Sequence, residues 1–305
     1  MNEIDISVKN FCKKYGDFTA VDNISFEVQH GEIFGLLGPN GAGKTSTLEC
    51  LEGLRTTDGG SLRVAGIDPT HQFRQLRNRI GVQLQASSLP ENIRAHEAMQ
   101  LFCAYHNIAP RFDLLDRLEL SSKKHTQYHE LSSGQQRRLA LALAVAHNPR
   151  VLFLDEPTAG LDVASRLALH NLMRELKAAG TTIIIATHDM AEAEEMADRI
   201  AILLSGKIVA TGTPLEITAS GAGLSKITVR TDQNCLVNSS AIFKDITKQI
   251  FKEDYAVFFT TNVGTSVSGI LSYVEKKGDQ LIDLRIERPS LEDRFLEITN
   301  TGVAK

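Results

Sequence analysis

The first two thirds of the chain alternate short apolar runs with segments in which apolar residues recur every three or four positions. Short apolar runs predict buried strands, whereas the longer period predicts helices that bury one face. The pattern predicts strands at residues 32–37, 151–154 and 181–186, and helices at residues 44–54 and 167–179. Gly180 directly follows the second of these helices, where a glycine commonly ends one. Strands that alternate with helices favour an α/β fold with a mostly parallel sheet covered on both faces.

The strand pattern disappears between residues 85 and 130, and helical spacing replaces it. Residues 92–105 and 113–120 are predicted to form helices. We therefore expect a helical insertion into the α/β core, at about residues 86–135.

The composition changes after Pro214, and residues 218–223 are small and polar, as in a linker. We expect one domain over residues 1–219 and a small α+β domain over residues 220–305. The pattern in the second domain predicts strands at residues 226–231, 255–261 and 281–287, and helices at residues 239–251, 266–277 and 290–297. Ser290 is expected to cap the last helix together with an acidic residue three positions later.

The composition is that of an ordinary globular protein. Of 305 residues, 42% are hydrophobic and 23% are charged, and 33 basic against 37 acidic residues leave a net charge of −4. Such values exclude the disordered, collagen-like and coiled-coil classes. The longest apolar run, residues 139–146, is far shorter than the ~18–20 residues that span a bilayer. The first ten residues carry two acids and no apolar core, so no signal peptide is expected.

The cysteine pattern and the charge balance restrict the classes of partner. Four cysteines, Cys12, Cys50, Cys103 and Cys235, show no C-x-x-C spacing. This argues against a disulfide framework or a zinc site and favours a reducing compartment. A mildly acidic chain without a long basic block gives no reason to expect nucleic acid as a partner. Composition therefore favours a cytoplasmic globular protein.

A glycine-rich segment between a predicted strand and a predicted helix matches the phosphate-loop pattern. It comprises Gly38, Pro39, Asn40, Gly41, Ala42, Gly43, Lys44 and Thr45, followed by Ser46. The glycines allow backbone angles that turn successive N–H groups toward one point, and the helix that starts there adds its positive dipole end. Lys44 supplies a charge for the outer phosphates, and the Thr45 hydroxyl supplies a hard oxygen for Mg²⁺. A glycine-rich turn without function does not account for the strand and the helix on either side.

Two carboxylates, Asp155 and Glu156, end the apolar strand at residues 151–154. The carboxyl ends of strands are where α/β sheets bind ligands. We expect Asp155 to hold Mg²⁺ through water, and Glu156 to take a proton from an attacking water molecule. A solvated acidic turn is the alternative interpretation of this pair taken alone.

Residues 133 and 134 begin a long predicted helix that runs through residues 139–146. The free N–H groups at the start of this helix form a second anion site. Because the chain already has a phosphate loop, the second site suits a nucleotide that another molecule holds.

Together, these residues resemble the ATP-binding subunits of ABC transporters, over about residues 4–219. The segment that resembles the signature motif of that family consists of Leu131, Ser132, Ser133, Gly134 and Gln135. The segment from Asp155 to Asp162 resembles the acidic strand end followed by the D-loop. Three further residues match the family. His188 resembles the switch histidine, and Tyr15 resembles the aromatic residue that stacks on adenine. Gln85 resembles the Q-loop glutamine, with Gln83 as the runner-up.

The resemblance implies an ATPase that binds ATP and Mg²⁺ and works as a head-to-tail dimer. Ser132 and Gly134 of one subunit would close on the γ-phosphate that the other subunit holds, with Gln135 and Asp162 in the same nucleotide-binding set. Ser133 stands where the family most often has glycine. Because serine adds bulk at a close backbone approach, we expect this difference to affect the rate of ATP hydrolysis. The resemblance implies that His188 forms hydrogen bonds with the γ-phosphate and the attacking water. It also implies that Gln85 is a ligand of Mg²⁺ and senses the partner protein.

The resemblance also implies a separate membrane permease, which would hold the subunit at the inner face of the cell membrane. Residues 288–296 resemble the C-terminal segment of drug-export ATPases of the daunorubicin-resistance type, which favours export. An amphipathic helix that closes the small domain is the alternative interpretation of that segment.

Two other function classes remain as alternatives. A soluble, non-transport ATPase of the same family is expected to carry a very long coiled-coil insertion or two tandem ATPase copies, and the chain shows neither pattern. A phosphate-loop kinase or GTPase is expected to lack the signature helix, which is present in this sequence.

Overall fold

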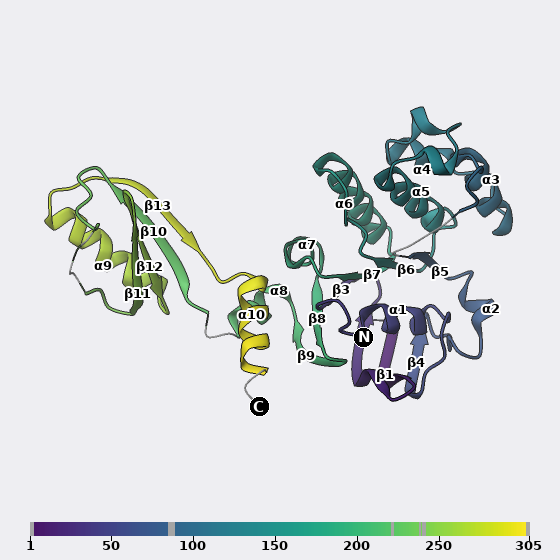
Figure 1. Ribbon diagram of the computed structural model, residues 1–305, viewed down its shortest axis with the longest axis horizontal. Helices are drawn as coiled ribbons and strands as arrows, with labels where there is room; N and C mark the ends of the chain where they lie inside the picture. Colours follow the sequence, from purple (N-terminus) through teal and green to yellow (C-terminus); the bar gives the residue numbers. More distant parts are fainter. Residues whose placement is uncertain (1–2, 85–88, 221–222, 238, 240–241, 303–305) are drawn as a thin grey trace. The chain divides into compact units, whose positions relative to one another are not determined.

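The computed structural model describes residues 3–84, 89–220, 223–237, 239 and 242–302 of the chain (Figure 1). The chain forms two compact units, residues 1–214 and residues 215–305. Within the described ranges, every helix falls short of the length and apolar character that crossing a membrane demands.

A six-stranded sheet forms the centre of the larger unit. In spatial order its strands are β5 (Ile80–Gln83), β6 (Val151–Asp155), β7 (Thr182–Thr187), β3 (Ile33–Leu37), β8 (Arg199–Leu204) and β9 (Lys207–Gly212). All neighbours run parallel except β8 and β9. Every residue of β3, β6 and β7 is buried, which explains why apolar residues predominate in these strands. The predicted α/β fold with a mostly parallel sheet is therefore confirmed.

Helices cover both faces of this sheet. Helix α1 (Lys44–Leu51) lies on one face, and α5 (Ser133–Val145) and α6 (Val163–Ala178) lie on the other (Figure 1). Helix α1 ends three residues before the predicted end, because Gly53 follows it in the left-handed region at φ 76°. The remaining helices of this unit are α2 (Phe73–Leu76), α3 (Ala95–Tyr105), α4 (Phe112–Arg117) and α7 (Met190–Met196), with short 3-10 turns at Ser121–Lys123 and Tyr128–Glu130.

A second, antiparallel sheet completes the larger unit, and the sequence pattern did not predict it. Its strands, in spatial order, are β2 (Phe18–Gln29), β1 (Ile4–Tyr15) and β4 (Gly59–Val64). Register shifts interrupt the pairing of β1 with both neighbours, and each shift breaks the alternation of apolar and polar residues that marks a strand. Side chains of both sheets and of α1 share one hydrophobic core, which includes Phe11, Leu48 and Phe153.

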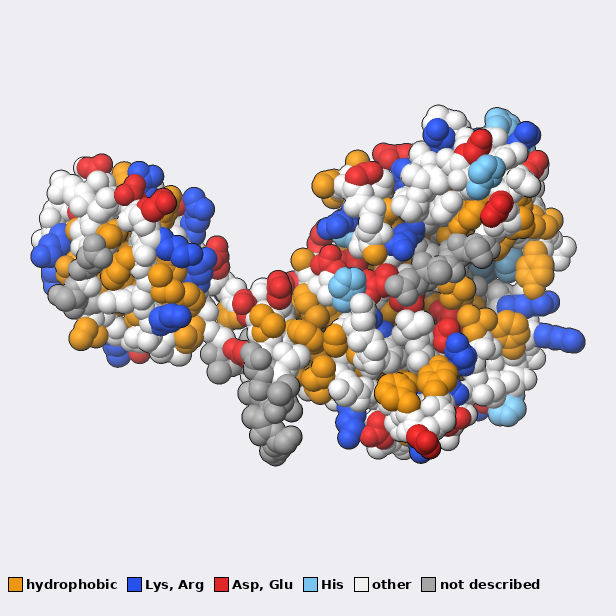
Figure 2. All heavy atoms as spheres, in the orientation of Figure 1, with side chains coloured by type: hydrophobic (Ala, Val, Ile, Leu, Met, Phe, Trp, Pro, Cys, Tyr) orange, Lys and Arg blue, Asp and Glu red, His pale blue; other side chains and the backbone are white. Residues whose placement is uncertain are grey.

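The smaller unit is built on a four-stranded antiparallel sheet. In spatial order its strands are β11 (Ile246–Lys252), β12 (Tyr255–Thr260), β10 (Ser225–Thr231) and β13 (Leu281–Glu287). Helix α9 (Val263–Lys276) packs its buried side chains on one face of this sheet. Figure 2 shows Lys and Arg side chains interspersed with hydrophobic ones on the viewed face of this unit. The helices α8 (Pro214–Ala219) and α10 (Leu291–Gly302) flank the sheet in the sequence.

The predicted helix over residues 239–251 is wrong, because residues 246–252 form strand β11 instead. Ile246, Ile250 and Phe251 fit a helical period, but the hairpin with β12 decides their structure. Lys252 pairs with Tyr255 across a two-residue turn, and Glu253 in that turn has a left-handed φ of 48°. Cross-strand pairing here prevails over local spacing.

The predicted cap of the last helix is confirmed. The Asp293 backbone N–H donates to Ser290 Oγ over 3.1 Å, and the Ser290 N–H donates to Asp293 Oδ2 over 2.9 Å. Each side chain thus accepts a bond from the other residue's backbone, as in a capping box.

Candidate active site

The phosphate loop connects β3 to α1 and is held in shape by backbone angles that glycine adopts at low cost. Gly43 starts α1 at φ 105°, and a Cβ there would lie 2.5 Å from the Ala20 carbonyl oxygen. Lys44 is only 6% exposed, and its Nζ donates to the carbonyl oxygens of Gly38 and Pro39 over 2.8 and 3.3 Å. The loop therefore presents N–H groups and one cation to the pocket in front of it.

Asp155, at the end of β6, lies beside the first turn of α1. The Thr45 Oγ1 hydroxyl donates to Asp155 Oδ2 over 3.0 Å. The other carboxylate oxygen, Asp155 Oδ1, is buried without a hydrogen-bond partner. Burial raises the pKa of Asp155. Hard oxygen donors with a vacant lone-pair direction are what Mg²⁺ takes from a protein, so these two residues fit that ion.

Glu156 follows Asp155 and contacts two other predicted site residues. Its backbone has a φ of 50°, a strained value for a residue other than glycine and one that clusters at functional sites. The side chain is buried, and its Oε1 lies 3.8 Å from Lys44 Nζ and 2.8 Å from His188 Nδ1. Burial lowers the pKa of Lys44, while the charges of Glu156 and Asp155 oppose that effect. The start of α1 and the ends of β6 and β7 thus bring one cationic side chain, one carboxylate and one imidazole together.

A pocket of about 360 Å³ lies in front of the phosphate loop. Tyr15 lines it, and its hydroxyl lies 3.2 Å from Ser46 Oγ. Lys13 Nζ and the Arg55 guanidinium each lie 5.4 Å from the centre of the Tyr15 ring. The other residues that line the pocket are Phe18, Ala20, Asn40, Gly41, Ala42, Gly43, Lys44, Thr45, Ser46, Asp155 and Glu156.

Phe18 is a lining residue that the sequence interpretation missed. It is 63% exposed and starts β2, three residues after Tyr15, in the hairpin that joins β1 to β2. The signal was present in the sequence, since an exposed aromatic pair around a glycine turn is uncommon on a surface without a ligand. Gly38 and Pro39, by contrast, do not line the pocket and instead bind Lys44 through their carbonyl groups.

The signature-like segment forms the start of α5 and lies outside this pocket. Ser132 caps the helix, because the Gln135 N–H donates to Ser132 Oγ over 3.3 Å and the Ser132 N–H donates to Gln135 Oε1 over 3.0 Å. Ser132 and Ser133 are exposed, and Gly134 is half-buried. The start of α5 is thus open to solvent, although the cap engages the Gln135 N–H, and an open helix start is compatible with a site that another molecule completes.

Three further predicted site residues are Asp162 and the two candidate Q-loop glutamines, Gln85 and Gln83. Asp162 caps α6, with the Ser165 N–H donating to its Oδ1 over 2.7 Å. Gln85 lies outside the described residues. The runner-up, Gln83, is buried on β5, and its amide atoms have no hydrogen-bond partner.

Comparisons with known proteins agree with this geometry. A family model described as ABC transporter matches residues 21–159, a span that contains the phosphate loop and the acidic pair. The chain is 32% identical over 307 residues to the daunorubicin resistance ATP-binding protein DrrA3 of Streptomyces coeruleorubidus, covering 98% of this chain and 97% of that protein. It is 38% identical to the Nod factor export ATP-binding protein I of Burkholderia orbicola, covering 75% of this chain and 77% of that protein.

Solved structures give the same family. A structure of the ATP-binding subunit of an ABC transporter superposes with a TM-score of 0.67 at 26% identity, covering 70% of this chain and 92% of that one. A dimeric ATP-binding cassette in a post-hydrolysis state with ADP and Pi superposes with a TM-score of 0.64 at 25% identity, covering 68% of this chain and 98% of that one. With a relative similar along its whole length and a phosphate loop facing an acidic strand end, the chain belongs to the ABC transporter family, as an ATP-binding, ATP-hydrolysing subunit.

Proposed function

We propose that this chain powers an exporter by binding MgATP in front of the phosphate loop, pairing head to tail with a second copy, and driving a separate membrane permease. The observation that carries the proposal is the cluster of Lys44, Glu156 and His188. Transfer of a phosphoryl group to water needs a cation for the phosphates, a carboxylate for the water and a donor between them. These three side chains supply each of those groups within hydrogen-bonding or ion-pair reach.

In the proposed reaction, Lys44 leaves the carbonyls of Gly38 and Pro39 and binds the outer phosphates. Glu156 then accepts a proton from water as the water oxygen bonds to the γ-phosphorus and the bond to the ADP oxygen breaks. His188 uses Nδ1 to bind Glu156, so its Nε2 is left for the γ-phosphate. Donors already placed where negative charge develops stabilise the transition state without further rearrangement.

We propose that Thr45 and Gln85 are ligands of the magnesium ion and that Asp155 holds the ion through water. When bound, the ion neutralises charge on the phosphates and orients them for in-line attack. Tyr15 is proposed to stack on adenine, and Ser46 and the loop residues around it bind the phosphate chain. Phe18 extends the aromatic surface from the same hairpin.

An Asp155→Asn chain is expected to need more Mg²⁺ for hydrolysis. The variant keeps the side-chain shape but loses the charged oxygen that holds the ion through water, and one charge-assisted contact is worth about 1.5–3 kcal/mol, or roughly a tenfold to hundredfold weaker site. The measurement is the Mg²⁺ concentration that gives half-maximal ATPase activity at fixed ATP. Asp189→Asn is the matched control, because Asp189 caps α7 and asparagine caps equally well. An unchanged Mg²⁺ requirement in Asp155→Asn would contradict the assignment.

We propose that the exposed start of α5 binds the nucleotide held by the second copy. Ser132 and Gln135 form the cap that orders this helix start, and Ser133 and Gly134 supply the N–H groups that the cap does not engage. Asp162 lies in the neighbouring D-loop segment. The dimeric ADP and Pi structure of a similar cassette supports this arrangement. In this arrangement each nucleotide is enclosed by two chains, so closure of the dimer and hydrolysis are coupled.

The direction of transport and the location rest on the named relatives. Two of them are a daunorubicin resistance ATP-binding protein and a Nod factor export ATP-binding protein, and these names support export. We propose that the subunit is held at the inner face of the cell membrane by its permease.

The division into an ATPase domain, residues 1–219, and an accessory domain, residues 220–305, stays a prediction.

The proposed function is tested by reconstitution with a candidate permease, chosen as a membrane protein whose gene neighbours that of this chain. In vesicles that contain both proteins, we expect substrate efflux that needs MgATP and ATP hydrolysis that rises when the permease is present. If hydrolysis and efflux are the same with and without that membrane protein, the proposal is wrong. That result would favour a soluble, non-transport ATPase of the same family.

A further inference from the structure

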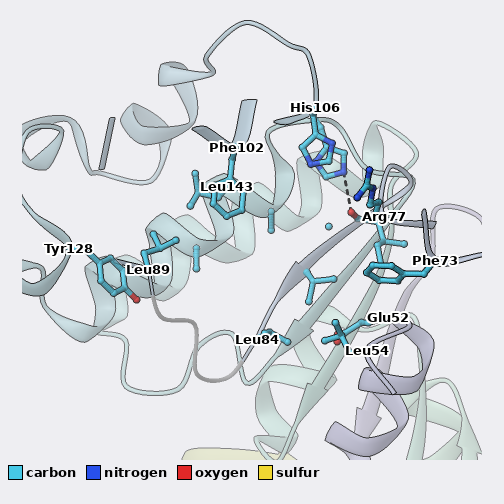
Figure 3. A pocket seen from close by; sticks show the side chains of 16 residues that line it. Glu52, Leu54, Phe73, Arg77, Leu84, Leu89, Phe102, His106, Tyr128 and Leu143 are labelled. Atoms are coloured by element: carbon cyan, nitrogen blue, oxygen red, sulfur yellow. Dashed lines mark hydrogen bonds between the residues drawn. The ribbon is translucent and has the colours of Figure 1, made fainter. Parts of the chain in front are cut away.

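Two pockets outside the proposed nucleotide site differ in charge. One, of about 460 Å³, lies between the central sheet and the helical segment, and Figure 3 shows Glu52 at one end of it. Its wall carries charges of both signs, because Arg77 also lines it. The other, the basic pocket, has a volume of about 320 Å³ and lies in the smaller unit. Among the described residues that line the basic pocket, those with a charge are all basic: Lys226, Lys252 and Arg285.

The basic pocket lies on the face of the four-stranded sheet that α9 leaves uncovered. Ile227 of β10 and Phe258 of β12 pack in the core that α9 covers. Because side chains alternate between the two faces of a strand, Lys226 and Thr228 of β10 and Phe259 of β12 point to the opposite face. The face of a sheet that points away from its core is usually polar, whereas this one combines basic with apolar residues.

An apolar strip forms the floor of the basic pocket. Val257 of β12 lies at its centre and is only 6% exposed. Tyr255 and Phe259 lie two residues to either side on the same strand, and Ile250 of β11 pairs with Val257. Lys248 Nζ lies 5.6 Å from the centre of the Phe259 ring and supports it from the side of β11. The floor therefore offers two aromatic rings and two aliphatic side chains to the apolar body of a ligand.

Basic and hydroxyl groups border the strip on the side of β10 and β13. Thr228 of β10 pairs with Val257 of β12 and with Arg285 of β13, and Lys226 lies two residues before Thr228 on the same face. Thr228 Oγ1 is buried, and none of the described residues forms a hydrogen bond with it. A buried hydroxyl without a partner costs free energy, so this group suits a ligand that supplies a hydrogen-bond acceptor.

The ion pairs that the bordering cations already form are weak. Lys226 Nζ lies 2.5 Å from Glu287 Oε2, and Arg285 Nε lies 2.8 Å from Asp283 Oδ2. Ion pairs that solvent reaches add little to stability, because water solvates both partners. Neither acid lines the basic pocket, and Lys252, which borders the strip on the side of β11, is exposed and has no ion pair with a described residue. The cations are thus available to an anionic ligand.

Protection of the sheet edges explains only part of this arrangement. Edge strands often carry basic residues, which discourage pairing with another chain, and Lys252 on β11 and Arg285 on β13 fit that role. Lys226 does not fit it, because β10 lies between β12 and β13 in the interior of the sheet. Edge protection also gives no reason for the apolar floor around Val257.

We propose that the basic pocket binds a small organic anion that combines an apolar ring system with one acidic group. The ring system lies on the apolar strip, and the acidic group binds Lys226, Arg285 and the Thr228 hydroxyl. A volume of about 320 Å³ is at the lower end of the range of small-molecule sites, about 300–1,000 Å³, and suits such a ligand. A nucleotide fits less well, because the apolar floor offers no partners for a ribose and a base. The site goes beyond the proposed function, since all its residues lie in the unit of residues 215–305.

The first experiment uses the whole chain with naphthalene-2-sulfonate and its neutral counterpart naphthalene-2-methanol as probes, and measures binding by titration calorimetry. Excess MgADP is present, because the nucleotide pocket also combines a cation with aromatic side chains. The sulfonate is expected to bind at least about tenfold more tightly than the alcohol, in line with one charge-assisted contact. Equal binding of the two probes, or no binding of either, would overturn the inference.

The second experiment locates the probe with variants that leave the net charge of the chain unchanged. The double variant Asp283→Asn with Arg285→Gln removes one cation together with its acid, and should lower sulfonate affinity to that of the alcohol. Thr228→Val keeps the shape of the side chain and the strand, and should weaken the sulfonate severalfold without affecting the alcohol. Glu275→Gln with Lys276→Gln is the matched control, because both residues are exposed on α9 and neither lines the basic pocket.

Two results would contradict the proposed ligand. If the double variant and Thr228→Val bind the sulfonate as wild type does, the probe binds elsewhere and the inference fails. Sedimentation with vesicles of phosphatidylglycerol, compared with phosphatidylcholine, tests for a lipid surface as the occupant instead. Wild type that binds no sulfonate but sediments with the anionic vesicles, in a manner lost in the double variant, would show that the sheet face contacts lipid and that the inference is wrong.

Discussion

A Glu156→Gln chain is expected to bind ATP as wild type does and to hydrolyse it about 10²–10⁴-fold more slowly, the range that loss of a general base produces. The glutamine keeps the shape of the side chain and meets the same strained backbone at φ 50°, so the loop should retain its structure. It also keeps an oxygen for His188. What it loses is the carboxylate that we propose accepts the proton of the attacking water.

The measurements that check this prediction are single-turnover hydrolysis, ATP affinity and size-exclusion chromatography with MgATP. Because hydrolysis reopens the dimer in the proposed cycle, the variant should accumulate as an ATP-bound dimer, whereas wild type should not. Glu130→Gln provides a control, since Glu130 is an exposed acid in the short turn before the signature-like segment. Turnover in Glu156→Gln equal to that of wild type would remove the assignment of Glu156 as the base.

The phosphate loop and the acidic strand end could be predicted from the sequence because their geometry is local. A glycine-rich turn between a strand and a helix determines its own backbone angles, and Lys44 is placed by the carbonyls of Gly38 and Pro39. The contact between Glu156 and His188 follows from topology, since β6 and β7 are parallel neighbours and both residues follow their carboxyl ends. Local spacing and strand order are therefore enough for the catalytic cluster.

Contacts between distant segments could not be predicted in the same way. Phe18 reaches the nucleotide pocket through the β1–β2 hairpin, and that sheet is irregular enough to hide its alternation. Residues 246–252 have helical spacing but form β11, because pairing with β12 places Ile246 and Phe251 against the core of the smaller unit, a contact that local spacing does not reveal. Glu52 likewise looks like an ordinary helix residue in the sequence, and only packing shows that its Oε2 is buried without a hydrogen-bond partner.

A Gly134→Asp chain is expected to fold and bind ATP but to lose ATP-dependent dimerisation and at least about 10²-fold of its hydrolysis. Gly134 lies in the first turn of α5, and a Cβ there meets only the flexible end of Leu161 at 3.3 Å. An acidic residue at a helix N-terminus stabilises the helix itself. In the proposed dimer, however, its charge would face the γ-phosphate held by the second copy, and like charges in an interface cost several kcal/mol.

Analytical ultracentrifugation of this variant with and without ATP measures the dimer, and nucleotide titration of the monomer measures binding. Gly134→Ala is the matched control, because it adds the same Cβ without a charge and should keep most of the activity. Raising the salt concentration should recover part of the dimer in the aspartate variant, since screening weakens repulsion between exposed charges. A Gly134→Asp chain that dimerises and hydrolyses ATP like Gly134→Ala would mean that the start of α5 does not approach a nucleotide, and the head-to-tail arrangement would have to be abandoned.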